Sequence, residues 1–432
     1  MNSLSSLTGR EILDSRGRPT VECRCVLSGG AWALASVPSG ASTGSAEARE
    51  LRDGDPQRYL GLGCRTAAAH LSGEIHQAFA GRSFADQRQF DRDLIELDGT
   101  ADKSRLGANA LLAASLAFAR AVALDRGVPL YDHFAGLLGD IPRQLPRLTI
   151  NLFSGGKHAG GQVPIQDVLI VPSSAASTDV ALSQAFAVYQ AAARLTLEKY
   201  GMRALTADEG GLAPPFPDAE SMLSDAVAAI RAAGLQPGTD VALAVDVAAT
   251  HFYDGRHYHW GSQRLDSGEM VQLLAGWLDR FPVVSIEDGL AENDWSAWPE
   301  LCRCLAPRAL VLGDDLLCTN PARIRRAIES RSATALLLKV NQIGTLSEAA
   351  DALRLASGAG WRVTVSARSG ETEDNWLADL AVGWSADQIK VGSITQSERL
   401  AKYNRLLAIE SDTHLPLVAW PAAPAENSGF AP

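Results

Sequence analysis

Six charged residues in the second half of the chain each stand at or just after the end of a short apolar run. Successive members lie 22 to 41 residues apart, and they are Asp246, Glu287, Asp314, Lys339, Arg368 and Lys390. A single acid in such a place is usually a helix N-cap or a solvated loop residue. Six in succession favour one shared site at which these side chains converge.

The three acids of this set predict a metal site. Carboxylates that arrive from three neighbouring strands repel one another unless a cation lies between them. Hard oxygen ligands suit Mg²⁺, which keeps coordination positions open for water or substrate oxygens. We therefore expect Asp246, Glu287 and Asp314 to surround a magnesium ion.

The cationic residues of the set predict an anion site beside the metal. A lysine near a divalent ion and a second lysine can have its pKa lowered enough to act as a base, while its neighbour stays charged and holds an anion. Either Lys339 or Lys390 taken alone would fit a surface role better. As a pair that flanks Arg368, they predict an anion pocket.

Three glycine-rich loops offer further polar groups. The loop over 37–55, "VPSGASTGSAEARELRDGD", has the composition of a mobile lid that closes on a phosphate or contributes Ser42 to a second metal ion. In "TADEGGLAPP", Glu209 precedes a Gly-Gly turn, and "SGGKHAGG" carries Lys157 and His158 at its tip. Composition of this kind is weak support for a site when it stands alone.

The elements that must position these residues are alternating strands and helices. The intervals between the charged residues accommodate a strand, a loop, a helix and a return, so we predict an α/β chain with a (β/α) barrel whose catalytic groups lie at the C-terminal strand ends. Before it, "TVECRCVL" over 20–27 predicts a strand and 108–124 predicts a buried helix. Gly and Pro over 136–146 indicate a linker.

Composition excludes several classes of protein. The 432 residues include 46% hydrophobic and 21% charged residues, which is typical of a globular chain with two domains. A net charge of −11 without a long basic run argues against a nucleic-acid partner. The N-terminus has no basic head followed by an apolar stretch, so we predict no secretory signal and no membrane partner, since Arg120 interrupts the most apolar segment.

The six cysteines predict a reducing compartment. Neither "CRC" stretch has the two-residue gap and the partners of a zinc site, so we interpret the cysteines as reduced packing residues of a cytoplasmic protein.

Ten motifs spread over the chain resemble the enolase family in order and spacing. They cover about residues 9 to 410 and read "GREILDSRGRPTVE", "VPSGASTG", "ELRDGD", "GANALLAASLA", "DEGGLAP", "SIEDGLAENDW", "DDLLCTNP", "LLLKVNQIGTLSE", "RSGETED" and "QIK". The resemblance implies an enolase-type (β/α)8 barrel over 139–432, capped by an N-terminal α+β domain over 1–138. It also implies a cytoplasmic homodimer that uses two Mg²⁺ ions per active site.

The resemblance assigns roles to single residues. It gives Asp246, Glu287 and Asp314 to the main Mg²⁺, Ser42 to a second one, Lys339 to the base and Glu209 to the acid. It places Asp167 in the catalytic site, and it implies substrate binding by His158, Arg368, Ser369 and Lys390. Lys157, which lies beside His158 at the tip of the same loop, is a further candidate for substrate binding. The division is physically reasonable, because the α-proton of a carboxylate is far too weakly acidic for lysine unless metal charges stabilise the product of its removal.

Several departures from the family pattern lie near the predicted site. Ala367 replaces the usual His beside Arg368, Asp167 replaces a Glu, and Lys157 replaces a Ser. Ser154 replaces an Asn and Gly289 a Pro, while "KVGS" stands for "KTGA" near Lys390. The predicted metal ligands, acid and base are retained, and this pattern favours an altered substrate over an inactive protein.

Three hypotheses follow from these residues. The first is a phosphopyruvate hydratase of glycolysis, which interconverts 2-phosphoglycerate and phosphoenolpyruvate. The second is a relative of carboxyphosphonoenolpyruvate synthase from phosphonate biosynthesis, for which Ala367 makes room and Lys157 adds positive charge toward a phosphonylated substrate. The third is a non-catalytic binding protein with the same fold, whose expected signature would be lost metal ligands. The first two share a small anionic phosphorylated or phosphonylated substrate.

Overall fold

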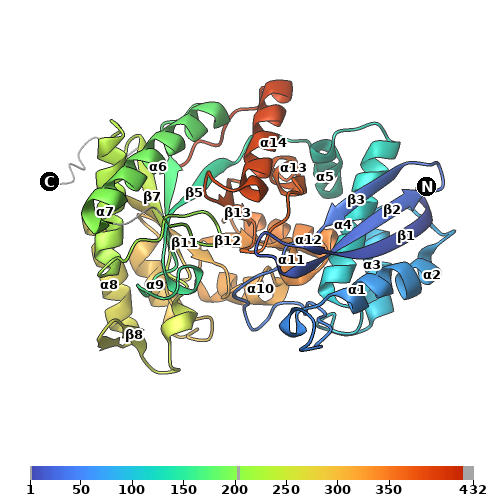
Figure 1. Cartoon of the computed structure of the whole chain (residues 1–432), viewed down its shortest axis with the longest axis horizontal. Helices are drawn as coiled ribbons and strands as arrows, with labels where there is room; N and C mark the ends of the chain where they lie inside the picture. The colour runs from blue at the N-terminus through green and yellow to red at the C-terminus, as the bar shows by residue number, and fades with distance from the viewer. Residues whose placement is uncertain (1, 202–204, 422–432) are drawn as a thin grey trace.

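The chain folds into an N-terminal part built on an antiparallel sheet and a C-terminal closed barrel (Figure 1). The computed structural model describes residues 2–201 and 205–421. The α/β class and the barrel predicted from the sequence are both confirmed.

The N-terminal sheet has the strand order β3-β2-β1-β4. Its strands are β1 (Asn2–Leu13), β2 (Pro19–Leu27), β3 (Trp32–Ser36) and β4 (Ser83–Phe84). The strand predicted over 20–27 is confirmed as β2, whose side chains nearly alternate between buried and less buried positions, as expected of a sheet with one packed face. The helices that pack on this sheet are α1 (Arg65–His70), α2 (His76–Phe79), α3 (Gln87–Asp98) and α4 (Ala108–Asp125), while α5 (Leu130–Leu138) packs between α4 and the barrel helices.

Helix α4 is the centre of the N-terminal part. It is long and apolar enough to cross a membrane by length and composition, but 83% of its 18 residues are buried inside the fold. It packs against β2 and β3, which confirms the buried helix predicted there. Within this helix, Arg120 pairs with Asp374 at 2.6 Å, so this charge joins the N-terminal part to the barrel.

The barrel closes in the order β10-β11-β12-β13-β14-β5-β6-β7. Its strands are β5 (Arg147–Ser154), β6 (Asp167–Pro172), β7 (Val241–Asp246), β10 (Val283–Glu287), β11 (Leu310–Gly313), β12 (Ala335–Leu338), β13 (Arg362–Ser366) and β14 (Gln388–Gly392). Neighbouring strands are parallel except around β6, which is antiparallel to both β5 and β7. The N-terminal end of β6 therefore lies at the mouth where the other strands have their C-terminal ends.

Helices cover the outside of the barrel (Figure 1). They are α6 (Thr178–Tyr200), α7 (Ala219–Ala232), α8 (Ser267–Arg280), α9 (Trp298–Leu305), α10 (Pro321–Ser330), α12 (Leu346–Gly358), α13 (Trp376–Gly383) and α14 (Ser397–Thr413), with a small hairpin of β8 (Tyr258–Trp260) and β9 (Gln263–Leu265). The short α11 (Val340–Ile343) is buried at the mouth, where it directly follows Lys339. Local sequence sets the starts of the outer helices. A capping box of Asp266 and Glu269 begins α8, and the Asn320 side chain caps α10 ahead of Pro321.

The two parts meet through polar contacts between α3 and α12. Asp91 on α3 is fully buried and accepts hydrogen bonds from the backbone N–H and the hydroxyl of Ser347, at 2.9 and 2.6 Å. Nearby, Lys103 pairs with Glu348 at 2.8 Å. These contacts hold the N-terminal part so that its loop over 37–55 reaches the barrel mouth.

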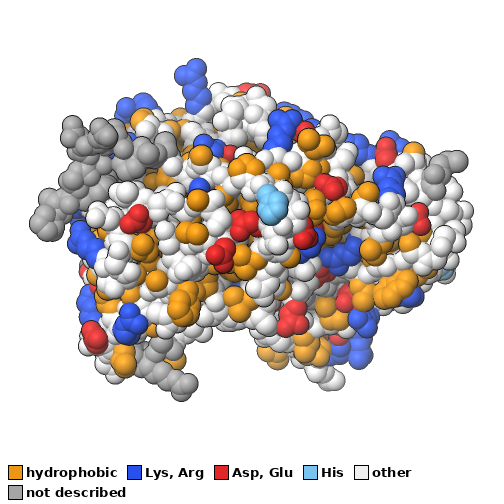
Figure 2. All heavy atoms as spheres, turned by 90° about the horizontal axis from the view of Figure 1, so that it is seen from above, with side chains coloured by type: hydrophobic (Ala, Val, Ile, Leu, Met, Phe, Trp, Pro, Cys, Tyr) orange, Lys and Arg blue, Asp and Glu red, His pale blue; other side chains and the backbone are white. Residues whose placement is uncertain are grey.

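The surface carries charges of both signs. On the face shown in Figure 2, acidic and basic side chains are interspersed among apolar ones. All six cysteines are unpaired, as predicted, and five of them are buried, so they contribute to packing.

Candidate active site

The strand ends bring the predicted charged residues to one mouth of the barrel. Asp246 and Glu287 are the last residues of β7 and β10, and the register of these strands places the two side by side. Asp314 and Lys339 directly follow β11 and β12, and Lys390 lies within β14. Strands β7, β10, β11 and β12 are consecutive parallel neighbours, and the parallel strand β14 follows after β13, so these side chains face a common space.

Lys390 bridges two of the acids. Its Nζ donates to Asp246 Oδ2 at 2.9 Å and to the two oxygens of Glu287 at 2.9 and 2.8 Å. Burial alone would lower the pKa of Lys390, but the charges of Asp246 and Glu287 outweigh burial and raise it. Burial and the neighbouring Asp246 raise the pKa of Glu287, because one lysine shared between two buried acids does not fully offset burial and their mutual repulsion.

Lys339 forms the second ion pair of the mouth. Its Nζ lies 2.5 Å from Asp314 Oδ2, and Gln342 donates to the other oxygen of Asp314 at 2.8 Å. The sequence suggested a lysine with a lowered pKa, but here Asp314 outweighs burial and raises the pKa of Lys339. The direct carboxylate contact is the physical reason for the difference.

A third group gathers at the junction of β5 and β6. His158 Nδ1 lies 3.0 Å from Asp167 Oδ2, and the Ser154 hydroxyl donates to Asp167 Oδ1 at 2.5 Å. Asn151 donates to Glu209 Oε2 at 3.1 Å. Asp167 reaches the mouth because it begins the antiparallel strand β6. Burial would lower the pKa of His158, but Asp167 outweighs it and raises the pKa to about 9, so His158 is cationic at neutral pH.

Acidic clusters that could bind a metal ion are present at this mouth. Within the described residues, two triads bring one ligand atom of each member within 4.8 Å of the others, namely His158–Asp167–Glu209 and Asp288–Asp314–Asp315. The predicted trio of Asp246, Glu287 and Asp314 is not such a triad, because lysine ammonium groups are interposed between its carboxylates. Three acids against two lysines leave an excess of negative charge on hard oxygen donors, which fits a divalent cation such as Mg²⁺.

The lid loop predicted over 37–55 covers Arg368. The guanidinium donates to Glu47 at 3.0 Å, to Asn341 at 3.0 Å and to the Ser42 carbonyl at 2.8 Å. A Cβ at Gly40 would come within 2.0 Å of the Arg368 side chain, so only glycine allows the loop this close. The Ser369 hydroxyl is held in the same way, by the backbone N–H of Ala41 at 2.7 Å.

The space enclosed by these groups is small, with a cavity volume of about 20 Å³. Of the predicted site residues, those that line it are Ser42, His158, Glu209, Asp246, Lys339, Arg368, Ser369 and Lys390. Glu287, Asp314 and Asp167 are buried behind this layer. Lys157 is exposed and does not line the cavity, since its turn directs it outward from the mouth.

Several polar residues of the site were missed by reasoning from the sequence, among them Asn151, which holds Glu209. Gln166 donates to Asp246 at 3.0 Å and Glu47 pairs with Arg368, while Asn341 and Gln342 bind Arg368 and Asp314. Asn341 and Gln342 lie two and three residues after Lys339, just past β12, so their place close to a predicted catalytic residue was an available signal. Glu47 offered no such signal, because its partner lies 321 residues away in the chain.

Two family models match this chain. The enolase N-terminal domain matches residues 4–134, and the enolase C-terminal TIM barrel domain matches residues 142–415. Together the matches cover both parts of the fold and every residue assigned to the site.

Proposed function

The chain belongs to the enolase family, and we propose that it is a Mg²⁺-dependent carbon–oxygen lyase that interconverts a 2-phosphoglycerate-like acid and a phosphoenolpyruvate-like product. Membership makes it an enolase-superfamily enzyme of the lyase type, whereas the substrate is the proposed part. One observation carries the proposal: a lysine base, a carboxyl acid and the anion-binding groups Arg368, Ser369 and Lys390 all line one cavity.

The base and the acid enter the cavity from different strands. Lys339 follows β12, whereas Glu209 is held by Asn151 of β5, and two further strands separate β12 from β5 around the barrel. A substrate between them can lose its α-proton to the Lys339 amine on one side and its β-hydroxyl toward Glu209 on the other. The C–H bonding pair becomes the new C=C bond, and the hydroxyl leaves as water once Glu209 has supplied a proton.

Glu209 needs a proton before it can act as the acid. Burial would raise the pKa of Glu209, but His158 and Arg399 outweigh burial and lower it, so Glu209 is ionised in this arrangement. His158 is the neighbouring cation, and Asp167 holds its ring through Nδ1. The His158–Asp167 pair therefore serves as the proton store beside Glu209.

The acids of the mouth would hold the metal ions. Asp246, Glu287 and Asp314 would hold one Mg²⁺, and Ser42 of the lid would contribute to a second. When bound, the ions supply the positive charge that stabilises the substrate carboxylate as its α-proton leaves. Asp314 now neutralises the Lys339 ammonium, so an amine base at Lys339 requires that Asp314 be engaged elsewhere.

Entry of the substrate requires the lid to move. A cavity of about 20 Å³ holds no three-carbon phosphate ester, and Glu47 occupies the guanidinium that would bind the phosphate. Displacement of Glu47 by a phosphate would exchange one charge-assisted pair for another, which keeps the cost of opening low. Because Glu47 of the lid and the phosphate compete for the Arg368 guanidinium, binding of the anion would release the lid from this contact.

A specific observation favours a second candidate, a relative of carboxyphosphonoenolpyruvate synthase. Ala367 lines the cavity directly beside Arg368, where the family usually has the imidazole of His. The missing ring leaves space next to the anion site for a bulkier phosphonylated group.

The test is the rise in phosphoenolpyruvate absorbance when 2-phosphoglycerate and Mg²⁺ are added. Turnover, increased further by Ala367→His, would establish the hydratase. No turnover of 2-phosphoglycerate, together with turnover of a phosphonoformate-derived donor, would establish the second candidate. No turnover of either substrate would contradict both.

A further inference from the structure

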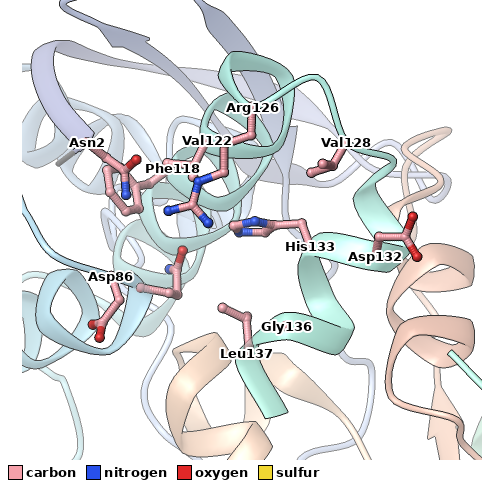
Figure 3. A pocket seen from close by; sticks show the side chains of 11 residues that line it. Asn2, Asp86, Phe118, Val122, Arg126, Val128, Asp132, His133, Gly136 and Leu137 are labelled. Carbon is pink, nitrogen blue, oxygen red and sulfur yellow. The ribbon is translucent and has the colours of Figure 1, made fainter. Parts of the chain in front are cut away.

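A second cavity lies in the N-terminal part, away from the barrel mouth. It encloses about 280 Å³ between α3, α4 and α5, and none of its lining residues is shared with the catalytic cavity. Figure 3 shows the side chains around it. Its size suits a ligand somewhat smaller than those that fill ordinary small-molecule sites.

One wall of this cavity is apolar. Phe118 and Val122 of α4 are buried and face it, and Leu137 of α5 completes the wall. Phe118 cannot turn away, because its ring is stacked on Phe90 with 4.0 Å between the ring centroids. The wall is therefore a fixed surface against which a short hydrocarbon or an aromatic ring can pack.

The other wall carries polar groups whose hydrogen bonding is incomplete. His133 is 8% exposed, and its Nε2 has no hydrogen-bond partner among the described residues. The Oε1 atom of Gln87, which also lines the cavity, lacks a partner as well. Buried polar atoms are nearly always satisfied by protein, water or a ligand, so the unpartnered His133 Nε2 indicates a missing partner in this cavity, while Gln87 Oε1 requires a donor such as water.

Arg126 gives the cavity its charge. Figure 3 shows its guanidinium directed into the cavity toward the His133 ring, whereas the carboxylates of Asp86 and Asp132 at the rim point away from the centre. Asp86 is already engaged, because it caps α3 by accepting from the Gln89 N–H at 2.8 Å. Burial and the Arg126 charge lower the pKa of His133 to about 4, so at neutral pH the ring is uncharged and offers one N–H donor.

From this arrangement we propose that the cavity binds a small organic monocarboxylate. The carboxylate would lie between the Arg126 guanidinium and the N–H of His133, and its apolar body would pack against Phe118, Val122 and Leu137. Guanidinium groups bind carboxylates through two parallel hydrogen bonds, which fixes the orientation of the anion. The site does not depend on the proposed catalytic function.

Direct binding to the full chain tests the site, with benzoate as the probe. Benzamide keeps the ring and removes the charge, while acetate keeps the charge and removes the ring. Titration calorimetry should show that benzoate binds more tightly than either, and Arg126→Ala should weaken benzoate binding by about tenfold or more. Arg126 is exposed, so this variant is expected to fold.

A second variant fills the cavity without damaging the helix. Gly136 lies in α5, lines the cavity and has no atom within 4 Å of an added Cβ, so Gly136→Leu places a side chain in open space. It should remove benzoate binding while leaving the melting temperature unchanged or higher, because glycine weakens a helix. Gly358→Ala in α12, which also meets no atom, is the matched control and should bind benzoate normally.

Three results would overturn the proposal. They are benzoate binding that survives both Arg126→Ala and Gly136→Leu, equal affinity for benzoate and benzamide, and crystals grown with benzoate in which the cavity holds ordered water only. The first would place the bound benzoate elsewhere, including the cationic barrel mouth.

Discussion

The two ends of the barrel both bury charge, but in opposite ways. At the mouth, acids and lysines crowd together and negative charge remains in excess. At the other end, Arg147 opens β5 as a single buried cation, and its guanidinium donates to the backbone carbonyls of Val418, Pro172 and Ala175. At this lower end, the N-terminal end of the parallel strands, fixed neutral carbonyl groups satisfy the buried charge. At the mouth, the excess negative charge favours binding of a further cation.

This difference separates stability from function. In barrels of this kind the C-terminal ends of the strands carry the chemistry and the N-terminal ends hold the fold together. Arg147 ties β5 to the segment after β6 and to the last described segment of the chain. The mouth instead pairs charged side chains mainly with one another, so these charges can exchange partners when a charged ligand binds.

The largest expected effect is at the mouth. Lys339→Ala should lower kcat by about 10² to 10⁴-fold, the usual contribution of a general base, in protein that remains folded at the assay temperature. Steady-state turnover measures the change in kcat, and thermal unfolding of the same sample shows whether the variant is folded. Lys199→Ala, on the outer helix α6, is the control and should keep its activity. A fully active Lys339→Ala enzyme would contradict the assignment of the base.

At the lower end of the barrel, a substitution should reduce stability and leave activity nearly unchanged. Arg147→Met leaves several buried carbonyls without a donor, and we expect a loss of about 2 to 4 kcal/mol in the free energy of unfolding with kcat nearly unchanged. Chemical denaturation measures the first and turnover the second. Arg308→Met removes an exposed ion pair and should change stability by less than about 0.5 kcal/mol. An Arg147 variant that folds normally but loses activity would contradict the assignment of stability to the lower end and of function to the mouth.

Asp91, a buried acid outside the mouth, should make the stability of the fold depend on pH. Burial raises the pKa of Asp91 from 3.8 to about 6, although several hydrogen bonds act in the opposite direction. The native state therefore holds this proton more tightly than the unfolded chain, so the contribution of Asp91 to stability falls as pH rises from about 4 to 6.

Asp91→Asn removes this titration. Relative to the wild type, the variant should gain about 1 to 3 kcal/mol in the free energy of unfolding between pH 4 and pH 7. Denaturant unfolding at several pH values measures the gap, and the exposed Asp279→Asn is the control. A gap that is constant with pH would show that Asp91 is ionised throughout.

The smallest effect concerns the lid. Glu47→Gln removes the charge that pairs with Arg368, so a phosphate should compete for the guanidinium more easily. We expect inorganic phosphate to inhibit turnover at a concentration about threefold to tenfold lower than for the wild type. Glu329→Gln, exposed on α10, should leave inhibition unchanged. Weaker inhibition by phosphate would mean that Glu47 helps to form the anion site.

Local sequence was sufficient to find the strand ends. Asp246, Glu287, Asp314 and Lys339 each follow an apolar run, and that pattern survives folding because parallel strands bring their ends together. The direction of β6 could not be predicted, since the run "DVLIVP" has no signal that distinguishes an antiparallel strand from a parallel one. The prediction that Asp167 lies in the catalytic site therefore came only from the family resemblance, and not from the local sequence.

Contacts between distant segments were beyond local patterns. The pairing of Glu47 with Arg368 depends on how the N-terminal part docks, and so does the pairing of Arg120 with Asp374. The outward direction of Lys157 depends on the turn after β5, whose glycines allow several orientations. The role of Lys157 in substrate binding stays a prediction.

Isotope exchange at the α-carbon tests the central claim most directly. In D₂O with Mg²⁺ and 2-phosphoglycerate, the wild type should exchange the α-proton for deuterium, as followed by NMR. Glu209→Gln should retain this exchange while net loss of water stops, and Lys339→Ala should lose both. Exchange that persists in Lys339→Ala, or is absent in the wild type while the product still forms, would contradict proton removal by this lysine.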